Sequence, residues 1–397
     1  MKHPALNLIR TASYAAFALC MMSPASHAAD AAARQLKPTV DAAIQPLMEK
    51  YRIAGMAVGV IEDGKPYVYN YGLASTQTRK PVTDATLFEI GSISKTFTAT
   101  LASYAQLNGK LSLTDDTERY LPTLRGRPFG KVSLLNLGTH TPGGLPLQVP
   151  DEIHNNAQLL EYFRDWQPAH PPGTFRTYSN PGIGTLGLIT AKSMNQDFSA
   201  LMEQRVFPAL GMKSSYLHVP AAKMPDYAQG YAKDDKPVRM TGGVLAAEAY
   251  GIRTNAADLL RFVQANMNLI PLDNTWQQAI TATHTGYFQS SVFTQDLIWE
   301  QYPYPVALST LETGNKLELI LNGTPATAID PPLPPQQNVW INKTGSTNGF
   351  GAYVAFVPQQ RIGIVMLANR NIPNEARVEA AHRILTALAG ESKQGAK

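Results

Sequence analysis

Strand patterns at both ends of the chain are the feature that most limits the folds open to it. Near the N-terminal end, the apolar run 53–61 and the segment 67–71 flank the turn Asp63-Gly64, which predicts an antiparallel hairpin. Near the C-terminal end, segments 352–357 and 362–367 predict a second hairpin. Because the sequence between them is mostly helical pattern and loop, the simplest fold joins both hairpins into one antiparallel sheet.

Helical patterns accompany this predicted sheet. A helix over 39–51 precedes the first hairpin, and apolar residues at four-residue spacing predict a second helix over 93–105. A last helix opens after Pro373 and is expected to stop at Gly390. Together these elements predict an α+β fold, in which an antiparallel sheet of N- and C-terminal strands is flanked by helices and a second lobe is mostly helical.

The expected lobe boundaries follow from the same patterns. The α/β lobe should contain approximately residues 29–105 and 320–397, and the helical lobe approximately residues 106–319. Five prolines lie between Pro325 and Pro335, and they predict a loop within the domain.

The first 28 residues carry the features of a secretory signal. Two cations, Lys2 and Arg10, precede an uncharged stretch at 11–22, and small residues end the segment. This stretch of 12 residues is well short of the roughly 20 that span a bilayer. We therefore expect residues 1–28 to be removed, which leaves an exported chain, 29–397, with no stable membrane association.

Cys20, the only cysteine, lies within the apolar stretch of this signal. The mature chain would then have no thiol nucleophile, no cysteine metal ligand and no disulfide, so its stability has to come from packing. Cys20 as a lipid-attachment site is the weaker alternative, because Leu19 occupies the preceding position, where such sites have a small residue.

A serine and a lysine three residues apart give the first indication of chemistry. In Gly91-Ser92-Ile93-Ser94-Lys95 the pair falls at the start of a predicted helix, where positions i and i+3 share one face. The Lys95 ammonium can therefore reach the Ser92 hydroxyl and take part in its deprotonation. Alone, the same residues are also typical of a helix N-cap followed by a surface lysine.

Two further motifs change this interpretation. Tyr178-Ser179-Asn180 lies in a loop bounded by proline and glycine, and Lys343-Thr344-Gly345 precedes the second hairpin. In this order, S-x-x-K, a Tyr-or-Ser element with Asn, and K-T-G form the signature of serine β-lactamases and penicillin-binding proteins. The presence of all three favours an active-site serine enzyme.

The sequence resembles the class C β-lactamases, the periplasmic cephalosporinases, over essentially the whole mature chain. Its Tyr-x-Asn motif favours class C and its esterase and peptidase relatives over class A, although Ser179 stands where class C usually has alanine. Segments 141–148, 248–251 and 369–374 are similar to that family as well. The resemblance implies the serine β-lactamase and penicillin-binding-protein-like fold, a periplasmic catalytic domain at 29–397, and hydrolysis of β-lactams, preferentially cephalosporins, that confers antibiotic resistance.

The resemblance also implies a role for each motif. Ser92 would attack the lactam carbonyl to form an acyl-enzyme, while backbone amides of Ser92 and Ser346 stabilise the oxyanion. Either Tyr178, drawn towards the phenolate by Lys95 and Lys343, or Lys95 itself would serve as the base, and the sequence leaves both alternatives open. The implied catalytic set is Ser92, Lys95, Tyr178 and Lys343.

The substrate-binding residues are likewise implied by the resemblance. Lys343, Thr344 and Asn374 would meet the carboxylate of the substrate, and Asn180 and Gln148 its acylamino side chain.

Three further members of this set have a structural alternative. Asn371 and Arg377 either bind substrate or only brace the C-terminal helix, and Tyr250 is either a wall of the cleft or a core residue. The whole implied set is Gln148, Asn180, Tyr250, Thr344, Gly345, Ser346, Asn371, Asn374 and Arg377.

Neither a cofactor nor a metal is implied by the remaining patterns. Gly182–Gly187 matches G-x-G-x-x-G, but it follows a polar loop rather than the apolar strand that dinucleotide binding requires, so packing is the better interpretation. His140 and His382 are expected to be core or surface residues, because no histidine pair with a third ligand is visible.

Two other functions fit the same motifs. A D-alanyl-D-alanine peptidase or serine esterase of the same fold would also use Ser92, Lys95 and Tyr178. A penicillin-recognising sensor would acylate Ser92 without turnover, but such sensors normally carry a membrane anchor.

A formal net charge of +4, or +2 without the signal, argues against nucleic acid as a partner. The expected partner is a small-molecule β-lactam, bound by a monomer.

Overall fold

The computed structural model describes residues 24–394, so Cys20 and most of the predicted signal lie outside the described residues. Of the described residues, 39–394 form one compact unit, and 24–38 belong to a separate unit. The first helix, α1 (Pro24–Lys50), starts well before the position predicted for it. In the described part, no helix is both long and apolar enough to cross a membrane.

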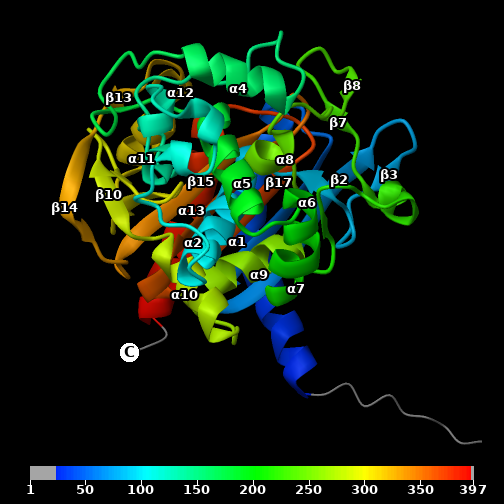
Figure 1. Cartoon of the computed structure of the whole chain (residues 1–397). Coiled ribbons are helices and arrows are strands. Elements are labelled where there is room, and N and C mark those ends of the chain that lie inside the picture. The colour runs from blue at the N-terminus through cyan, green and yellow to red at the C-terminus, as the bar shows by residue number, and fades with distance from the viewer. Residues whose placement is uncertain (1–23, 395–397) are drawn as a thin grey trace, which may run out of the picture. The chain divides into compact units, whose positions relative to one another are not determined.

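A ten-stranded antiparallel sheet contains both predicted hairpins, which confirms them (Figure 1). In order across the sheet, the strands are β14 (Thr327–Leu333), β10 (Gly286–Gln289), β11 (Thr294–Gln295), β12 (Glu300–Pro303), β15 (Val339–Ser346), β16 (Gly351–Val357), β17 (Ile362–Ala368), β1 (Gly55–Glu62), β2 (Lys65–Ser75) and β3 (Lys80–Pro81). The two hairpins join through β1 and β17, where Met56 lies opposite Ala368 and Ile61 opposite Gly363. The predicted α+β class is therefore confirmed.

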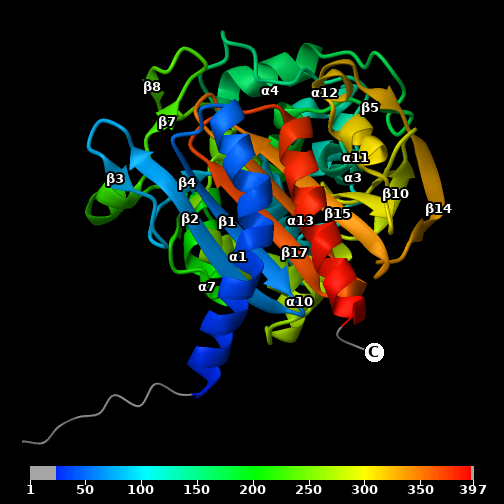
Figure 2. The same ribbon diagram turned by 180° about the vertical axis from the view of Figure 1, so that it is seen from behind.

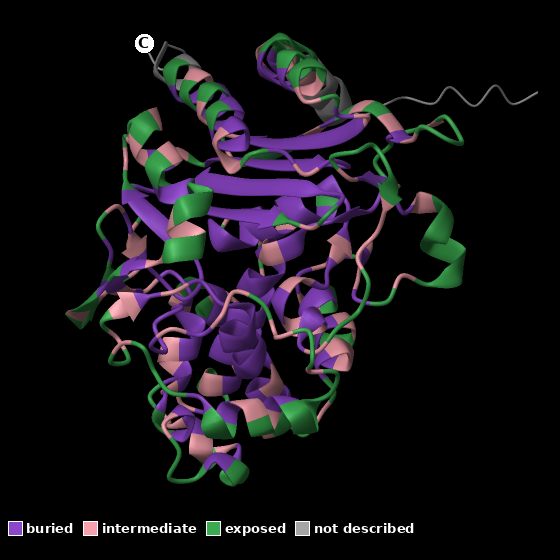
Figure 3. Cartoon of the chain, turned by 90° about the horizontal axis from the view of Figure 1, so that it is seen from above, coloured by how far each residue is buried: buried purple, intermediate pink, exposed green. Residues whose placement is uncertain are grey.

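Helices cover both faces of this sheet (Figure 2). Helix α13 (Asn374–Gln394) packs on β16 and β17 from one side, and α9 (Ala256–Asn266) packs on β1, β2 and β17 from the other. The central strands between them are buried, as the edge-on view in Figure 3 shows. On the α9 side the core includes Phe97 from α2 (Ser94–Leu107), stacked on Phe262 with ring centroids 3.9 Å apart.

A second core surrounds three mutually packed helices: α2, α5 (Asn180–Ser193) and α8 (Ala246–Tyr250). Helix α2 confirms the predicted helix at 93–105, and a single 3₁₀ turn, η1 (Gly91–Ile93), precedes it. The G-x-G-x-x-G motif lies inside α5, where a Cβ added at Gly184 would lie 2.7 Å from the Cβ of Leu245. Its glycines thus let α8 approach α5, which is the packing role that the sequence predicts.

Shorter elements complete the unit. The helices are α3 (Leu134–Gly138), α4 (Asn156–Asp165), α6 (Phe198–Leu201), α7 (Phe207–Ala209), α10 (Asn274–Ala282), α11 (Leu308–Asn315) and α12 (Leu317–Asn322). The strands are β4 (Phe88–Glu89), β5 (Phe175–Arg176), β6 (Ser215–Tyr216), β7 (Gly230–Tyr231), β8 (Pro237–Val238), β9 (Arg253–Thr254) and β13 (Thr324–Pro325).

Three details differ from the sequence-based expectation. Strands β10, β11 and β12 come from a stretch expected to be helix and loop, because strands this short leave no readable periodicity. Two of the five prolines expected in a loop, Pro331 and Pro332, lie in β14, an edge strand with an irregular register against β10, where a missing N–H is tolerated. Helix α13 continues past Gly390 to Gln394, since one exposed glycine costs a helix only about 1 kcal/mol. The lobe boundaries near residues 105 and 320 stay a prediction.

The contact of α5 with α8 gives opposite predictions for two helical glycines. Gly184→Ala should lower the free energy of unfolding by about 1–3 kcal/mol, because the new methyl group would overlap Leu245. Gly390→Ala is the control and should raise it slightly, by at most about 1 kcal/mol, because its surroundings are open and alanine is the better helix former. Denaturant unfolding measures both; equal effects would contradict the packing role of Gly184.

Candidate active site

A backbone contact that only glycine permits places the serine of the first motif. Gly91, at the start of η1, has a φ of +50°, and a Cβ there would lie 2.5 Å from the Ser346 nitrogen. From the other side, a Cβ at Gly345 would lie 2.0 Å from the Ile90 carbonyl oxygen. The turn that carries Ser92 therefore touches the end of β15.

Lys95 is buried in α2 and directed at this serine. Its Nζ donates hydrogen bonds to Ser92 Oγ at 2.9 Å and to the Ala249 carbonyl oxygen at 2.8 Å. Burial, aided by the charge of Lys343 and opposed by Tyr178, lowers the pKa of Lys95 to about 8. An ammonium with this pKa, bonded to a hydroxyl, is suited to exchange a proton near neutral pH.

Tyr178 lies between the two motif lysines. The Nζ atoms of Lys95 and Lys343 are 5.2 Å and 5.0 Å from the centroid of its ring. Burial raises the pKa of Tyr178, but the charges of Lys343 and then Lys95 outweigh it, and the result is a pKa lowered to about 8. The structure thus brings Ser92, Lys95, Tyr178 and Lys343 into one site, with two groups that can hold or release a proton beside one nucleophile.

Asn180 and Gln148 also come together beside this group. Asn180 is the first residue of α5, and its Nδ2 donates to Gln148 Oε1 at 2.8 Å. Its backbone nitrogen donates to the Leu147 carbonyl oxygen at 2.9 Å, so two hydrogen bonds join the start of α5 to the 147–148 segment. Asn180 Oδ1 is buried without a hydrogen-bond partner among the described residues, so it is an unsatisfied acceptor.

Arg377 on α13 is buried and holds the end of β15. Its guanidinium donates to the carbonyl oxygens of Gly345 at 2.6 Å and Ala352 at 2.8 Å. It also donates to Ser346 Oγ at 2.9 Å and to Asn374 Oδ1 at 2.5 Å. Of the two roles open to Arg377 from the sequence, these contacts favour bracing.

The other expected substrate-binding residues differ in the contacts that they make within the protein. Lys343 Nζ donates to the carbonyl oxygen of Thr344 at 3.1 Å, and both residues lie on the strand end that Arg377 holds. Asn374 Nδ2 donates to the Asn315 carbonyl oxygen at 2.9 Å. Asn371 makes one long contact, between its Oδ1 and the Arg377 guanidinium at 3.5 Å. Tyr250 is half-buried and packs on the second core.

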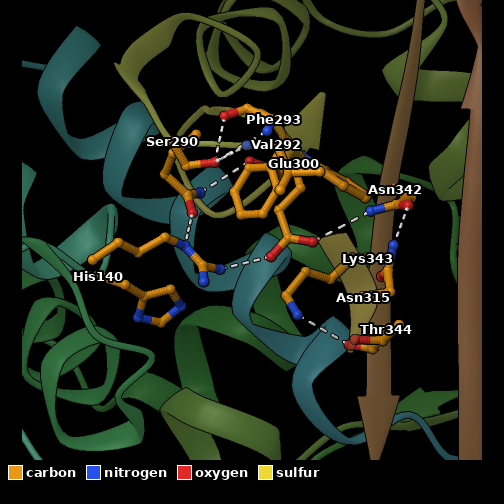
Figure 4. Close-up of polar contacts among 12 residues, drawn as sticks. His140, Ser290, Val292, Phe293, Glu300, Asn315, Asn342, Lys343 and Thr344 are labelled. Atoms are coloured by element: carbon orange, nitrogen blue, oxygen red, sulfur yellow. Dashed lines mark hydrogen bonds and ion pairs between the residues drawn. The ribbon is translucent and has the colours of Figure 1, made fainter. Parts of the chain in front are cut away.

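A buried ion pair behind Tyr178 is not apparent in the sequence. The Arg176 guanidinium carbon lies 5.7 Å from the Tyr178 ring centroid, and the guanidinium donates to Glu300 Oε1 at 2.6 Å and to Gln295 Oε1 at 2.5 Å. Figure 4 shows Glu300 also joined to Asn342, whose Nδ2 donates to Oε2 at 3.4 Å. No local pattern points to Glu300, because it lies far from the motifs along the chain.

The two histidines singled out in the sequence lie in different surroundings. His140 is a buried residue, as one alternative expected, but its ring centroid is only 4.2 Å from that of Tyr178. His382 lies on α13, where its Nε2 is 3.1 Å from the Val306 carbonyl oxygen. Within residues 24–394, no group of three or more His, Cys, Asp or Glu side chains is arranged to hold a metal ion.

Comparisons with known proteins agree with this geometry. The β-lactamase family model matches residues 40–389. A β-lactamase of Pseudomonas fluorescens is 50% identical over 356 residues, which are 90% of this chain and 99% of the relative. Among solved structures, a D-alanine carboxypeptidase AmpC from Burkholderia cenocepacia is 61% identical with a TM-score of 0.86, covering 89% of this chain and 99% of that one. A class C β-lactamase in complex with cefoxitin is 56% identical with a TM-score of 0.87 and the same coverage. The chain therefore belongs to the β-lactamase family, as a serine hydrolase of its class C.

Proposed function

We propose that this chain hydrolyses β-lactam antibiotics, preferentially cephalosporins, through an acyl-enzyme on Ser92, and so confers resistance on its host. The observation that carries the proposal is the hydrogen bond from Lys95 Nζ to Ser92 Oγ, with Tyr178 held between Lys95 and Lys343. The preference for cephalosporins is supported by the resemblance to the cephalosporinases and by the 56% identity to a class C enzyme solved with cefoxitin.

In the acylation step, Ser92 Oγ attacks the lactam carbonyl carbon while its proton passes to Tyr178 or Lys95. Each of these groups has a pKa of about 8, so the pair titrates as a unit and either member can take the proton. The amides of Ser92 and Ser346 would donate to the oxyanion, since their backbone segments touch at Gly91. The lactam C–N bond then breaks, and the proton moves to the leaving nitrogen.

In the deacylation step, water attacks the Ser92 ester. Tyr178, between two ammonium groups, would accept the proton of this water once the lactam nitrogen has taken the first one. The ester C–O bond breaks, Ser92 Oγ recovers a proton, and the ring-opened acid leaves. The same neighbourhood thus serves both halves of the reaction.

The substrate would be held at its two ends. Lys343, Thr344 and Asn374 would meet the carboxylate, and the amide of Asn180, with Gln148 beside it, would meet the acylamino side chain. The buried Oδ1 of Asn180, which has no partner among the described residues, supports the second assignment.

Residues around these contacts would shape the site without changing its chemistry. Gly345 would let the strand end approach η1, and Tyr250 would form a wall of the cleft. Arg377 and Asn371 would act by holding the strand end, because the guanidinium of Arg377 bonds protein atoms in the described chain.

A D-alanine carboxypeptidase is the second candidate, because a 61%-identical structure carries that name. Its chemistry would use the same acylated serine, so only the fate of the ester distinguishes the two. A peptidase or a sensor would keep a β-lactam on Ser92 for a long time, whereas a β-lactamase must release it quickly.

We also propose that the protein acts in the periplasm as a monomer after its signal is removed. N-terminal sequencing of mature protein from a Gram-negative periplasm should find Ala29 as the first residue, because Ser26 and Ala28 suit the cleavage subsites. A mature chain that still carried Cys20, with or without a lipid, would contradict this proposal.

Substitution of the serine–lysine pair tests the nucleophile. Ser92→Ala should abolish acylation, and Lys95→Ala should lower kcat/KM by about 10²–10⁴, because the lysine supplies proton transfer to a hydroxyl that it bonds directly. Lys110→Ala, which removes an exposed lysine just beyond the same helix, should leave kcat/KM unchanged. Intact-mass and peptide mass spectrometry locate the acyl group. Acylation of another residue, or reversible loss of activity with a chelator, would refute the assignment.

Loss of the Tyr178 hydroxyl tests turnover. The wild-type protein should turn over a good cephalosporin at about 10 per second or faster, so its acyl-enzyme should be short-lived. Tyr178→Phe should lower kcat far more than it weakens binding, because one oxygen is lost and the cavity hardly changes. Tyr162→Phe on α4 is the control and should behave as wild type.

Stopped-flow absorbance with quenched mass spectra measures the lifetime of the acyl-enzyme, and release of D-alanine from a D-alanyl-D-alanine peptide measures the second candidate activity. A wild-type acyl-enzyme that lasted for minutes on every cephalosporin would reject the β-lactamase and favour the peptidase or the sensor.

A further inference from the structure

His140 contacts the backbone on both sides of Tyr178. Its carbonyl oxygen accepts the amide hydrogen of Thr177 at 2.8 Å, and its ring Nδ1 accepts that of Ser179 at 3.3 Å. Between these two bonds the imidazole packs on the phenol ring, with centroids 4.2 Å apart and planes inclined by 35°. A single residue thus holds the backbone and the side chain of Tyr178.

The backbone of His140 adopts a conformation that bulky residues seldom take. Its φ is +60°, in the left-handed region. Such a conformation persists where neighbouring contacts enforce it. Here two hydrogen bonds hold the next residue, Thr141. Its amide nitrogen donates to the Asn136 carbonyl oxygen, and its carbonyl oxygen accepts from the Gly173 nitrogen, each at 2.9 Å. With this φ, the carbonyl oxygen and the ring of His140 both reach the Tyr178 segment.

The surroundings of His140 require a neutral ring. Because Nδ1 accepts a hydrogen bond, the neutral imidazole carries its proton on Nε2. Burial, together with the charges of Arg176, Lys95 and Lys343, holds the pKa of His140 well below its ordinary value. A protonated ring would lose the bond to Ser179 and add a further positive charge beside Tyr178.

We propose that His140 is a positioning residue for Tyr178: as a neutral acceptor it anchors the amides on either side of Tyr178 and keeps the phenol between Lys95 and Lys343. Figure 4 shows the His140 ring and the Lys343 side chain pointing into the same region. An apolar ring would fill the space but leave the buried Ser179 amide unpaired. The inference rests on the proposed function only where turnover is measured, because the position of Tyr178 can be tested without substrate.

The test compares two variants that separate the ring from the acceptor. His140→Phe keeps a ring but has no acceptor, and His140→Asn keeps an acceptor on a residue that tolerates the left-handed region. In ¹³Cζ-tyrosine NMR, the wild-type signal that disappears in Tyr178→Phe should titrate with a pKa of about 8. His140→Phe should raise this pKa towards the ordinary value of tyrosine, because the phenol moves away from the lysines. His140→Asn should restore the wild-type titration.

The matched control is His284→Gln, since His284 is another buried histidine, bonded to Asn266 Oδ1 at 2.9 Å and packed on Trp299 and Phe356. This variant changes the core but should leave the Tyr178 titration unmoved. An unchanged Tyr178 titration in His140→Phe, or the same change in His140→Asn and His140→Phe, would overturn the proposal.

Two further measurements cover the remaining outcomes. In ¹⁵N NMR of the wild-type histidine rings at pH 7, His140 should be neutral with its proton on Nε2. An imidazolium, or a proton on Nδ1, would overturn the proposal even if His140→Phe does not fold.

With a cephalosporin, His140→Phe should lower kcat about tenfold or more with KM within about threefold, and His140→Asn should recover most of the lost kcat. A wild-type protein that hydrolyses no β-lactam would refute the proposed function, and the NMR titrations would still decide the role of His140.

Discussion

The close approach of two backbone segments at Gly91 and Gly345 is the constraint on which the rest of the site depends. A Cβ at either position would overlap backbone atoms of the other segment, at 2.5 Å or less. The contact sets the start of α2 against the end of a strand in the middle of the sheet. Arg377 reaches the same strand end from α13, on the opposite face, and hydrogen-bonds the Gly345 carbonyl oxygen. The serine and the K-T-G strand are therefore held from both sides of the sheet.

The site also depends on the three cations that surround the ring of Tyr178. Lys95, Lys343 and Arg176 all lie within 6 Å of its ring centroid, and Glu300 pairs with the last of them. Burying an ion costs several kcal/mol unless partners compensate for it, and the fold supplies them as hydrogen bonds to carbonyl, amide and carboxylate groups. The uncompensated part of this cost appears in the lowered pKa of Lys95, whereas the charges of Lys343 and Lys95 outweigh burial and lower the pKa of Tyr178. Burial of Lys95 and the lysine charges beside Tyr178 together bring the proton exchange of both groups near neutral pH.

Local patterns were sufficient wherever a single stretch of chain decided its own structure. Both hairpins follow from apolar runs around a short turn, and α2 follows from apolar spacing, because these preferences act over a few residues. The reach of Lys95 to Ser92 follows from helical geometry alone, and the structure gives that distance as 2.9 Å. Local preference failed at Gly390 and in β14, where a helix and an edge strand tolerate residues that usually end them.

The sequence by itself therefore determined the strand-rich ends of the sheet, the serine–lysine pair and the three motifs that belong to one site. Only the tertiary structure decided that β10, β11 and β12 extend the sheet, that Glu300 pairs with Arg176, and that Arg377 braces the strand end. It also decided that His140 lies against Tyr178 rather than elsewhere in the core. The physical reason is that each of these contacts joins residues far apart in the chain. Their energy depends on the partner that the fold supplies and leaves no mark in the local pattern of either residue.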